Sequence, residues 1–428
     1  MAQRPAHSAD STSPPLPSEQ WSSRFGFLMA TIGSALGLGN IWRFPYVVGV
    51  SGGGAFLLPY ALAILLCGLP VLVLELASGR RLTGGVVGAF QRVRSRARWV
   101  VAGWAIGYFA YGILGRHPPF ESFTGGANSV VFFLVATVMT AGVVRLGVRR
   151  GIEATSKVLM PLLFLMLAGL AVYGVFLPGW GAAMQFYLKP DFSALGDALV
   201  WVRAFGQVFF SLGVGMGVMI TYGSYMSRRE NVPTSAAIVA VADSGAAFLA
   251  GLVIFPIVFS FGGEPGAGPK LAFDTLPLVF AQFPVGTGFV LAVLFYLLLT
   301  IAALTSSVSL LEMVIVAARE TTGVSRARAL YVLAPALALL GLPSALSYSG
   351  VGLDVLGQPF LDRLDTIVST FGLSVGVLLT VLVLGWLAHR RVLLKDAPRG
   401  AVGWAWLWLV RLAAPAAIVA VLVSLALR

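Results

Sequence analysis

The chain contains little charge, one cysteine and three histidines. Only 11% of its 428 residues are Asp, Glu, Lys or Arg, whereas 58% are hydrophobic. So much apolar surface cannot be hidden inside a water-soluble fold, and lipid must solvate part of it. The apolar runs repeatedly reach the ~20 residues that a helix needs to cross a bilayer, and the short alternating segments of a membrane β-barrel are absent. We therefore predict an all-α polytopic membrane protein.

The scarce cysteine and histidine residues exclude several chemistries. Cys67 lies in an apolar run without a partner, so no intrachain disulfide can form, and a buried hydrophobic role is favoured. His7, His117 and His389 all fall in tails or loops between the apolar runs. Because neither a nucleophile–base pair nor a metal-ligand cluster occurs within the spans, we do not expect an enzyme.

The apolar runs and the Gly and Pro residues between them predict about 11 transmembrane helices. We place these spans near 22–48, 54–79, 99–115, 128–147, 154–177, 197–226, 234–261, 286–319, 327–346, 363–388 and 403–427. The preceding segment, 1–20, is rich in Ser and Pro and is expected to be a disordered cytoplasmic tail, not a cleaved signal peptide.

Basic residues are concentrated in the loops on one side of the predicted membrane spans. With a cytoplasmic N-terminus, the inward loops contain Arg80, Arg81, Arg92, Arg94, Arg96, Arg98, Arg145, Arg149, Arg150, Arg228, Arg229, Arg319, Arg326, Arg328, Arg390, Arg391, Lys395 and Arg399. The outward loops contain Arg116, Lys189, Lys270 and Arg363. The positive-inside rule thus accounts for the net charge of +12 better than nucleic-acid binding does. The same rule places the C-terminus on the outer side of the membrane.

Two of the spans are interrupted by glycines. The first contains Gly33-Ser34-Ala35-Leu36-Gly37-Leu38-Gly39-Asn40 and the sixth contains Ser211-Leu212-Gly213-Val214-Gly215-Met216-Gly217. Either segment alone is compatible with close helix packing through small residues. Together, each opening a set of five spans, they are typical of an inverted repeat with a binding site at the membrane midplane. Unwound backbone there exposes carbonyls to a cation, and half-helix N-termini attract a carboxylate.

Residues 21–60, which read WSSRFGFLMATIGSALGLGNIWRFPYVVGVSGGGAFLLPY, closely resemble the start of the neurotransmitter:sodium symporter family. Further matches are Glu75, GQVFFSLGVGMG followed by TYGSY, LTSS at 304–307 and FLDRLD at 360–365. The resemblance to its prokaryotic amino-acid transporter branch implies a leucine-transporter-like fold, with a 5+5 inverted repeat, broken helices 1 and 6, and an extra C-terminal helix. We expect repeats at 21–180 and 195–390, and the additional span at 403–428.

The resemblance also implies sites for one or two sodium ions, both made of oxygen ligands, which hard cations prefer. Site A would comprise Gly33, Leu36, Ala302, Thr305 and Ser306. Site B would comprise Ala35, Asn40, Ser211 and Asp243. Asp243 departs from the family's leucine transporter, which has an amide at this position, and a negative charge should strengthen cation binding or let a proton partly substitute. Ala247 stands at the position linked to chloride dependence, so chloride use stays open.

The same resemblance implies a pocket for an amino acid. Its residues would be Ser34, Ala35, Gly37, Leu38, Gly39, Phe210, Ser211, Gly213, Met216, Ser306 and Leu310. Relatives that carry monoamines have an aspartate in place of Gly37, whereas an amino acid supplies its own carboxylate. Small residues at Gly37 and Gly213, with the flexible Met216, leave room for a hydrophobic or aromatic side chain.

Four gate residues and two structural residues complete the implied site. Arg43 and Asp365 would close the outer mouth with Phe210 as a lid, although Arg43 could instead snorkel to the outer surface. Glu320 occupies the acidic position of the inner gate. The usual arginine there is replaced by Ser18, and Arg24 is the nearest substitute. Glu75 and Gln207 are expected to support the unwound backbone.

The third span departs from the family pattern. The interval from Glu75 to Trp104 is about twenty residues shorter than in the leucine transporter, so either Tyr108 or Tyr111 supplies the pocket's usual tyrosine or the pocket lacks it.

We expect sodium-coupled symport of a small amino acid in a prokaryotic inner membrane. The alternative is a transport-impaired relative that binds or senses amino acids. The particular amino acid, the sodium stoichiometry and the oligomeric state are not readable from the sequence.

Overall fold

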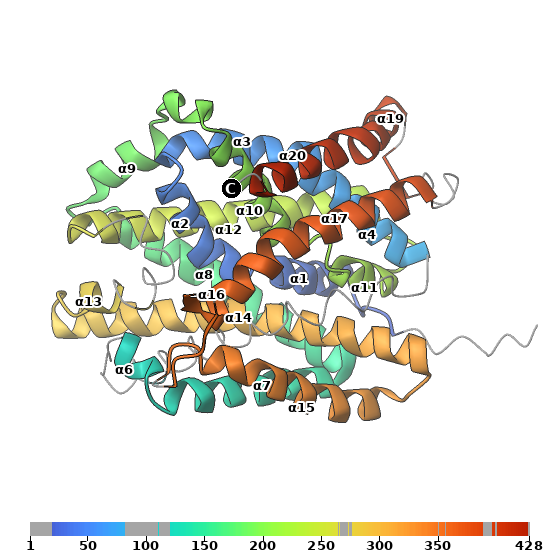
Figure 1. Cartoon of the computed structure of the whole chain (residues 1–428), viewed down its shortest axis with the longest axis horizontal. Coiled ribbons are helices and arrows are strands. Elements are labelled where there is room, and N and C mark those ends of the chain that lie inside the picture. Colours follow the sequence, from blue (N-terminus) through green and yellow to red (C-terminus); the bar gives the residue numbers. More distant parts are fainter. Residues whose placement is uncertain are drawn as a thin grey trace, which may run out of the picture.

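The computed structural model describes residues 19–81, 120–263, 276–349, 351–355, 357–387, 396–398 and 400–426, together with residues 110, 265 and 273. Most of these residues are helical, and the long helices run roughly along one axis of the molecule (Figure 1). Within these ranges seven helices are long and apolar enough to cross a membrane, or eight when one bent pair is counted as a span. The prediction of an all-α polytopic membrane protein is confirmed.

Helices occupy ten of the eleven expected spans, and the third span, 99–115, lies outside the described residues. In the following bounds, η marks a π- or 3-10-helical segment. The first half contains α1 (Arg24–Ala35), η1 (Gly39–Arg43), α2 (Phe44–Gly49), η2 (Gly53–Phe56), α3 (Leu57–Ala63), η3 (Ile64–Gly68), α4 (Leu69–Arg81), α6 (Phe120–Thr124), α7 (Asn128–Arg145), η4 (Val148–Glu153), α8 (Ala154–Gly174), α9 (Trp180–Leu188) and η5 (Phe192–Gly196).

The second half contains α10 (Ala198–Leu212), α11 (Val218–Ser224), α12 (Val232–Ser260), α13 (Leu276–Phe280), α14 (Val285–Thr322), α15 (Arg326–Ala345), α16 (Phe360–Asp365), η7 (Thr366–Gly372), α17 (Leu373–Leu382), η8 (Val383–Leu387), α19 (Ala401–Trp408), η9 (Leu409–Ala413) and α20 (Ala414–Ala426). A short antiparallel hairpin, β1 (Asp354–Val355) with β2 (Gln358–Pro359), precedes α16. The division into two repeats stays a prediction.

The first and sixth spans are both broken, as their glycines predict. In the first span, α1 and the Gly39–Gly49 helix meet at a 50° bend. In the sixth, the backbone between α10 and α11 turns through Gly213, Gly215 and Gly217, whose φ angles are +66°, +79° and +85°. Side-chain-bearing residues rarely adopt this left-handed region, so glycine is what permits the break.

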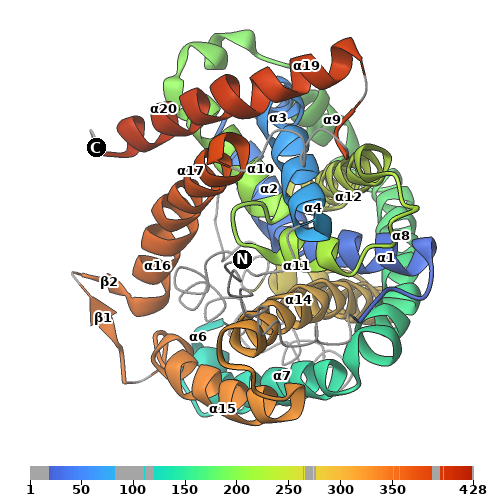
Figure 2. The same cartoon turned by 90° about the vertical axis from the view of Figure 1, so that its right-hand side faces the viewer.

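The broken spans lie among the long helices. The α1 helix packs against α8, α12 and α14, while α11 packs against α4. In Figure 2, α2, α4, α10 and α11 lie toward the middle, with α7 and α15 on one side and α19 and α20 on the opposite side.

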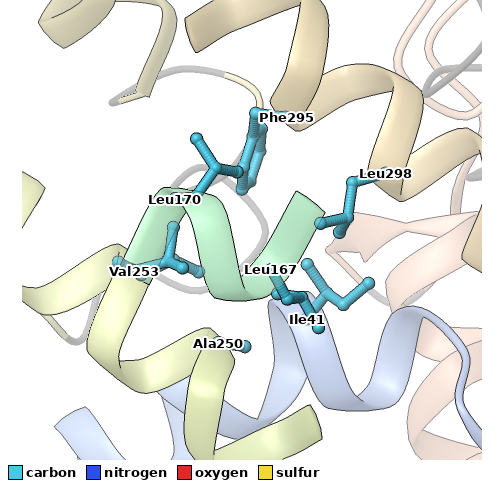
Figure 3. A pocket seen from close by; sticks show the side chains of 8 residues that line it. Ile41, Leu167, Leu170, Ala250, Val253, Phe295 and Leu298 are labelled. Atoms are coloured by element: carbon cyan, nitrogen blue, oxygen red, sulfur yellow. The ribbon is translucent and has the colours of Figure 1, made fainter. Parts of the chain in front are cut away.

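An apolar cluster fixes the first span just beyond its break. Figure 3 shows its side chains converging from η1, α8, α12 and α14, and they belong to Ile41, Leu167, Leu170, Ala250, Val253, Ile254, Phe295 and Leu298. The space they enclose is too small for a water molecule. Tight packing of this kind holds the residue before Ile41, Asn40, in a defined position.

A buried carboxylate joins the end of the second span to the segment before α19. Asp396 accepts hydrogen bonds from the guanidinium groups of Arg80 and Arg81. Arg80 also donates to the carbonyl of Glu230 at 2.5 Å. Burial by itself raises the pKa of Asp396, but the hydrogen bonds from Arg81 and Arg80 outweigh it and hold the pKa below its usual range.

Asp396→Asn is expected to lower stability by about 1.5–3 kcal/mol, because it weakens charge-assisted hydrogen bonds and leaves Arg80 without a counter-charge. Since the folded-state pKa is depressed, the carboxylate's contribution is present above its unfolded pKa of about 3.9 and disappears only as the pH falls through the lower folded value. Thermal unfolding of the detergent-solubilised protein between pH 4 and 8 measures the effect. The exposed Asp354→Asn is the matched control, and equal melting curves for the two variants would contradict the prediction.

Candidate functional site

Three buried polar side chains meet where the two breaks face α12. The side-chain amide of Asn40 donates to Ser211 Oγ at 2.8 Å, to Asp243 Oδ1 at 2.8 Å and to the Asp243 carbonyl at 3.0 Å. Ser211 Oγ in turn donates to Asp243 Oδ2 at 2.6 Å. Asn40 Oδ1 accepts from the backbone N–H of Gly37 at 3.2 Å, which ties the cluster to the break in the first span.

Three of the side chains implied for sodium site B are therefore together, and the fourth residue, Ala35, is the last of α1. Asn40, Ser211 and Asp243 are fully or almost fully buried. A buried carboxylate with only hydrogen-bond donors around it carries an uncompensated negative charge, which favours a cation. Tyr60, whose buried phenol lies beside Asp243 and Ser211, also belongs to this region, although no sequence pattern singled it out.

The residues implied for sodium site A lie on α1 and α14, which pack against each other. Gly33 is in the last turn of α1 and Leu36 is its C-terminal cap. On α14, Thr305 Oγ1 donates to the carbonyls of Ile301 and Ala302 at 3.0 and 3.2 Å.

Among the residues implied for sodium site A, Ser306 gives the clearest sign of a bound ligand. Its hydroxyl is buried and has no hydrogen-bond partner in the described structure. A Cβ placed on Gly37 would come within 2.4 Å of Ser306 Oγ, so the hydroxyl points directly at the unwound segment. Buried hydroxyls are rarely left unpaired, and an oxygen in this position fits a cation or a polar substrate group.

All eleven residues implied for the substrate pocket are buried. The Phe210 ring covers Gly39, since a Cβ on Gly39 would lie 2.6 Å from two ring carbons. The methyl group of Met216 approaches Gly213, at 3.4 Å from an added Cβ. Ser34 Oγ donates to Ser309 Oγ at 2.9 Å, which joins α1 to α14, and Leu310 lies within the core.

On the other side of the break, Arg43 contacts Gln207 and Phe210. Its Nη1 donates to Gln207 Oε1 at 2.7 Å, and its guanidinium carbon lies 4.8 Å from the centre of the Phe210 ring. Gln207 Nε2 donates to the Gly39 carbonyl at 2.8 Å, so this side chain connects the break to Arg43. Asp365 is in α16, but its side chain lies outside the described residues, so its pairing with Arg43 stays a prediction.

Glu75 supports the break in the sixth span. Its Oε1 accepts a hydrogen bond from the backbone N–H of Gly215 at 2.6 Å. The residue is fully buried, and Oε2 has no partner in the described structure. This contact is the structural role that the resemblance implies for Glu75.

At the opposite end of the core lies a group of ion pairs that the sequence did not predict. Glu312 accepts from the Tyr225 hydroxyl at 2.7 Å and from both Nη atoms of Arg326 at 2.8 and 2.5 Å. Arg326 also lies 3.3 Å from Glu19, and Arg319 lies 3.7 Å from it. These ion pairs tie the segment before α1 to α14 and α15.

Arg24 does not take the position expected for the inner-gate arginine. Its Nε lies 3.4 Å from Glu230 Oε2, and its side chain is about half exposed. Instead, the segment before α1 contributes an acid, Glu19, while the arginines come from α14 and α15, so the charges across this contact are reversed relative to the expected arrangement. Trp21 packs against the same end, where its indole N–H donates to the Tyr222 carbonyl at 3.1 Å.

Comparison with known proteins shows the family of the chain. The model of the Sodium:neurotransmitter symporter family matches residues 18–114 and 105–428. The chain belongs to this family. The symporter is therefore a multi-pass membrane transporter that uses sodium, and it is not an enzyme.

The symporter is similar to several proteins over most of its length. The sodium-dependent transporter YhdH of Bacillus subtilis, itself uncharacterized, is 36% identical over 446 positions, which cover 95% of this chain and 97% of YhdH. A crystal structure of MhsT in complex with L-phenylalanine superposes with a TM-score of 0.88 at 36% identity and covers 95% of this chain and 99% of MhsT. The sodium- and chloride-dependent GABA transporter 2 of Bos taurus is 29% identical, covering 62% of this chain and 56% of that protein.

The family match is divided in the third span of the symporter. Its two parts overlap at residues 105–114, close to the place where the interval from Glu75 to Trp104 is short. The alignment with YhdH is also longer than this chain, so YhdH contains residues that the symporter lacks. Tyr108 and Tyr111 lie outside the described residues, so their role in the pocket stays a prediction.

Proposed function

We propose that the chain couples the inward movement of sodium to uptake of a hydrophobic or aromatic amino acid by alternating access. The observation that carries this proposal is the buried cluster of Asn40, Ser211 and Asp243 at the two helix breaks, next to the unpaired hydroxyl of Ser306. These side chains offer oxygen atoms and one carboxylate in a region closed to water, which suits a dehydrated sodium ion.

The substrate would lie between the two proposed sodium sites. Gly37 supplies no acid for an amine-only ligand, whereas an amino acid brings its own carboxylate to the exposed backbone and the cation. Met216 and Gly213 together form an adaptable apolar wall, and Met side chains accommodate ligands of different shape. MhsT, which was crystallised with L-phenylalanine, supports an aromatic or large aliphatic side chain for the substrate.

Alternating access requires that the two ends of the site open in turn. One end is closed by Arg43 over Phe210, and we assign Asp365 as the partner that completes this outer gate. At the other end, release requires separation of Glu19 and Trp21 from α11, α14 and α15. Glu19 pairs with two arginines there, so we assign this contact, with Glu320 nearby in sequence, to the inner gate.

The basic loops support a cytoplasmic N-terminus and an outer C-terminus. The bacterial and archaeal relatives, among them one from Methanocaldococcus jannaschii at 31% identity, support a prokaryotic cell membrane. We propose two sodium sites, A and B. No chloride site is proposed, because Ala247 is buried and carries no polar side chain.

Ligand-induced thermal stabilisation tests the substrate assignment. The purified protein is heated with L-phenylalanine, L-tryptophan, L-leucine, glycine or D-phenylalanine, in sodium chloride or in potassium chloride. A ligand at 100 times its Kd stabilises the folded state by about 2.7 kcal/mol. We expect stabilisation by the large L-amino acids in sodium only. Stabilisation that is equal in potassium, or that is greatest with glycine, would contradict the proposal.

A second candidate function is binding or sensing of an amino acid without transport. The divided family match in the third span favours it, because the resemblance implies a pocket tyrosine in this span, where the interval from Glu75 to Trp104 is short. Sodium-dependent stabilisation without accumulation of the same amino acid in vesicles would support this alternative.

A further inference from the structure

An arginine lies well inside the last membrane span. The helix composed of α19, η9 and α20 crosses the membrane from Ala401 to Ser424, and Arg411 is ten residues from its beginning. Ionisable side chains within spans are rare, costly and usually functional. The proposed transport mechanism makes no use of this one.

Two π-helical segments face each other around Arg411. The segments η8 and η9 are in contact, and each frees a backbone carbonyl from the ordinary helical pattern. Arg411 Nε donates to the Gly385 carbonyl at 2.8 Å, and Trp386 Nε1 donates to the Arg411 carbonyl at 3.3 Å. The helices approach closely because residue 385 is glycine, since an added Cβ would lie 3.1 Å from Val410 Cγ1. Such π segments often mark functional sites.

The hydrogen bond to Gly385 uses only one of the N–H donors of the Arg411 guanidinium. The two Nη groups of Arg411 donate no hydrogen bond within the described residues, and no described Asp or Glu forms an ion pair with the guanidinium. The side chain is only partly covered by protein. In a lipid environment, unpaired N–H groups and an unbalanced positive charge are both unfavourable, so a polar anionic partner is required.

One exposed tryptophan contacts the guanidinium, and two more lie in the preceding helix α19. The guanidinium carbon lies 5.3 Å from the centre of the Trp386 ring. Trp404 and Trp408 precede Arg411 by seven and three residues, which places them on the same face of their helix. Trp386, Trp404 and Trp408 are 51%, 56% and 59% exposed. Exposed tryptophans of this kind are typical of the layer where lipid headgroups meet the hydrocarbon.

The guanidinium lies near the headgroup layer even though its Cα is deep in the span. Side chains on a helix point toward its N-terminal end, here toward Ala401. Its acceptor, Gly385, is three residues from position 388, where the sequence predicts the end of this span, and three residues correspond to a rise of about 4.5 Å. The loop that follows in the sequence contains Arg390, Arg391 and Lys395, which assigns this end to the cytoplasmic side.

We propose that Arg411, Trp386, Trp404 and Trp408 form a binding site for an anionic phospholipid of the cytoplasmic leaflet. The free Nη atoms present the two-pronged geometry that matches a phosphate. The indole rings would contact the acyl chains next to the headgroup. A zwitterionic headgroup brings its own cation next to the phosphate, whereas an anionic headgroup leaves the charge of Arg411 as the main counter-charge. The preferred ligand is therefore an anionic lipid such as phosphatidylglycerol.

Native mass spectrometry of the full-length protein in detergent tests this site, with titration of phosphatidylglycerol or phosphatidylcholine of identical acyl chains. We expect at least fivefold preference for phosphatidylglycerol and a tenfold or greater loss of its affinity in Arg411→Gln. Arg411→Lys, which keeps the charge but loses the planar fork, should lose about threefold. Arg145→Gln, at the exposed end of α7, is the matched control and should change the affinity less than twofold.

Two further results would overturn the proposal. Phosphatidylglycerol affinity in Arg411→Gln within twofold of the parent would show that the lipid binds elsewhere. Displacement of the lipid by millimolar inorganic phosphate would show that the site recognises a free anion and not a lipid. If Arg411→Gln does not fold in detergent, Arg411→Lys decides, because unchanged affinity in that variant contradicts recognition by the guanidinium fork. Sodium-dependent amino-acid stabilisation of each variant serves as the check on folding.

Discussion

Asp243→Asn is expected to raise the sodium concentration that gives half-maximal amino-acid uptake by at least tenfold, and Asp243→Ala to abolish measurable uptake. The carboxylate is the only acid in the cluster with Asn40 and Ser211, and it accepts hydrogen bonds from both. Asparagine removes the charge that attracts the cation, and a tenfold change corresponds to about 1.4 kcal/mol. Alanine additionally removes the acceptor of the buried Ser211 hydroxyl, which costs about 1–3 kcal/mol when the donor is left unpaired.

Initial uptake rates measured at increasing sodium concentration and constant ionic strength test this prediction. Thr137→Ala is a suitable control, because Thr137 is buried in α7 and its hydroxyl bonds only to the Phe133 carbonyl of its own helix. We expect an unchanged sodium dependence for that variant. Asp243→Asn with the sodium dependence of the parent would show that the carboxylate is structural and does not bind the ion.

Gly215→Ala is expected to destabilise the protein by about 2–6 kcal/mol and to abolish amino-acid binding. Its φ angle of +79° costs about 1–3 kcal/mol for a residue with a side chain. The added Cβ would also lie 2.4 Å from Val377 Cγ2 and 2.6 Å from its backbone N. Overpacking of this kind costs typically 1–3 kcal/mol. Any relief of the clash moves the Gly215 N–H away from Glu75 and disturbs the break.

Thermal unfolding and sodium-dependent stabilisation by L-phenylalanine measure this effect. Gly206→Ala in α10 is the control, because nothing lies within 4 Å of the added Cβ and alanine is better than glycine within a helix by about 0.5–1 kcal/mol. We expect Gly206→Ala to melt at or above the parent temperature. If Gly215→Ala has the stability of the parent and still binds the amino acid, the break does not depend on glycine at this position.

The positions of the spans and of the breaks could be predicted because they depend on local properties of the sequence. Apolar length determines where a helix can cross the membrane, and the glycines between Ser211 and Gly217 mark the break directly. The cluster of Asn40, Ser211 and Asp243 also followed, because Asn40 and Ser211 lie on motifs with a recognisable position and the resemblance implies Asp243 as the fourth member of site B. The structure then showed which atoms meet.

Contacts between helix ends could not be predicted in the same way. Glu312 lies within the expected span 286–319, but its pairing with Arg326 depends on the angle between α14 and α15 and on the rotamers of both side chains. The reversed charges at Glu19 had no sequence signal, because a surface acid before a helix is common. The contact between Arg411 and Gly385 depends on the register of two π segments, which hydrophobicity patterns do not record.

Accumulation of radiolabelled L-phenylalanine in proteoliposomes tests the central claim most directly. Vesicles that contain potassium and are diluted into sodium establish an inward sodium gradient. We predict that the amino acid accumulates transiently above its external concentration, and that a sodium ionophore or replacement of external sodium by potassium abolishes the accumulation. Uptake at the same rate and extent without a sodium gradient would contradict sodium-coupled symport by this chain.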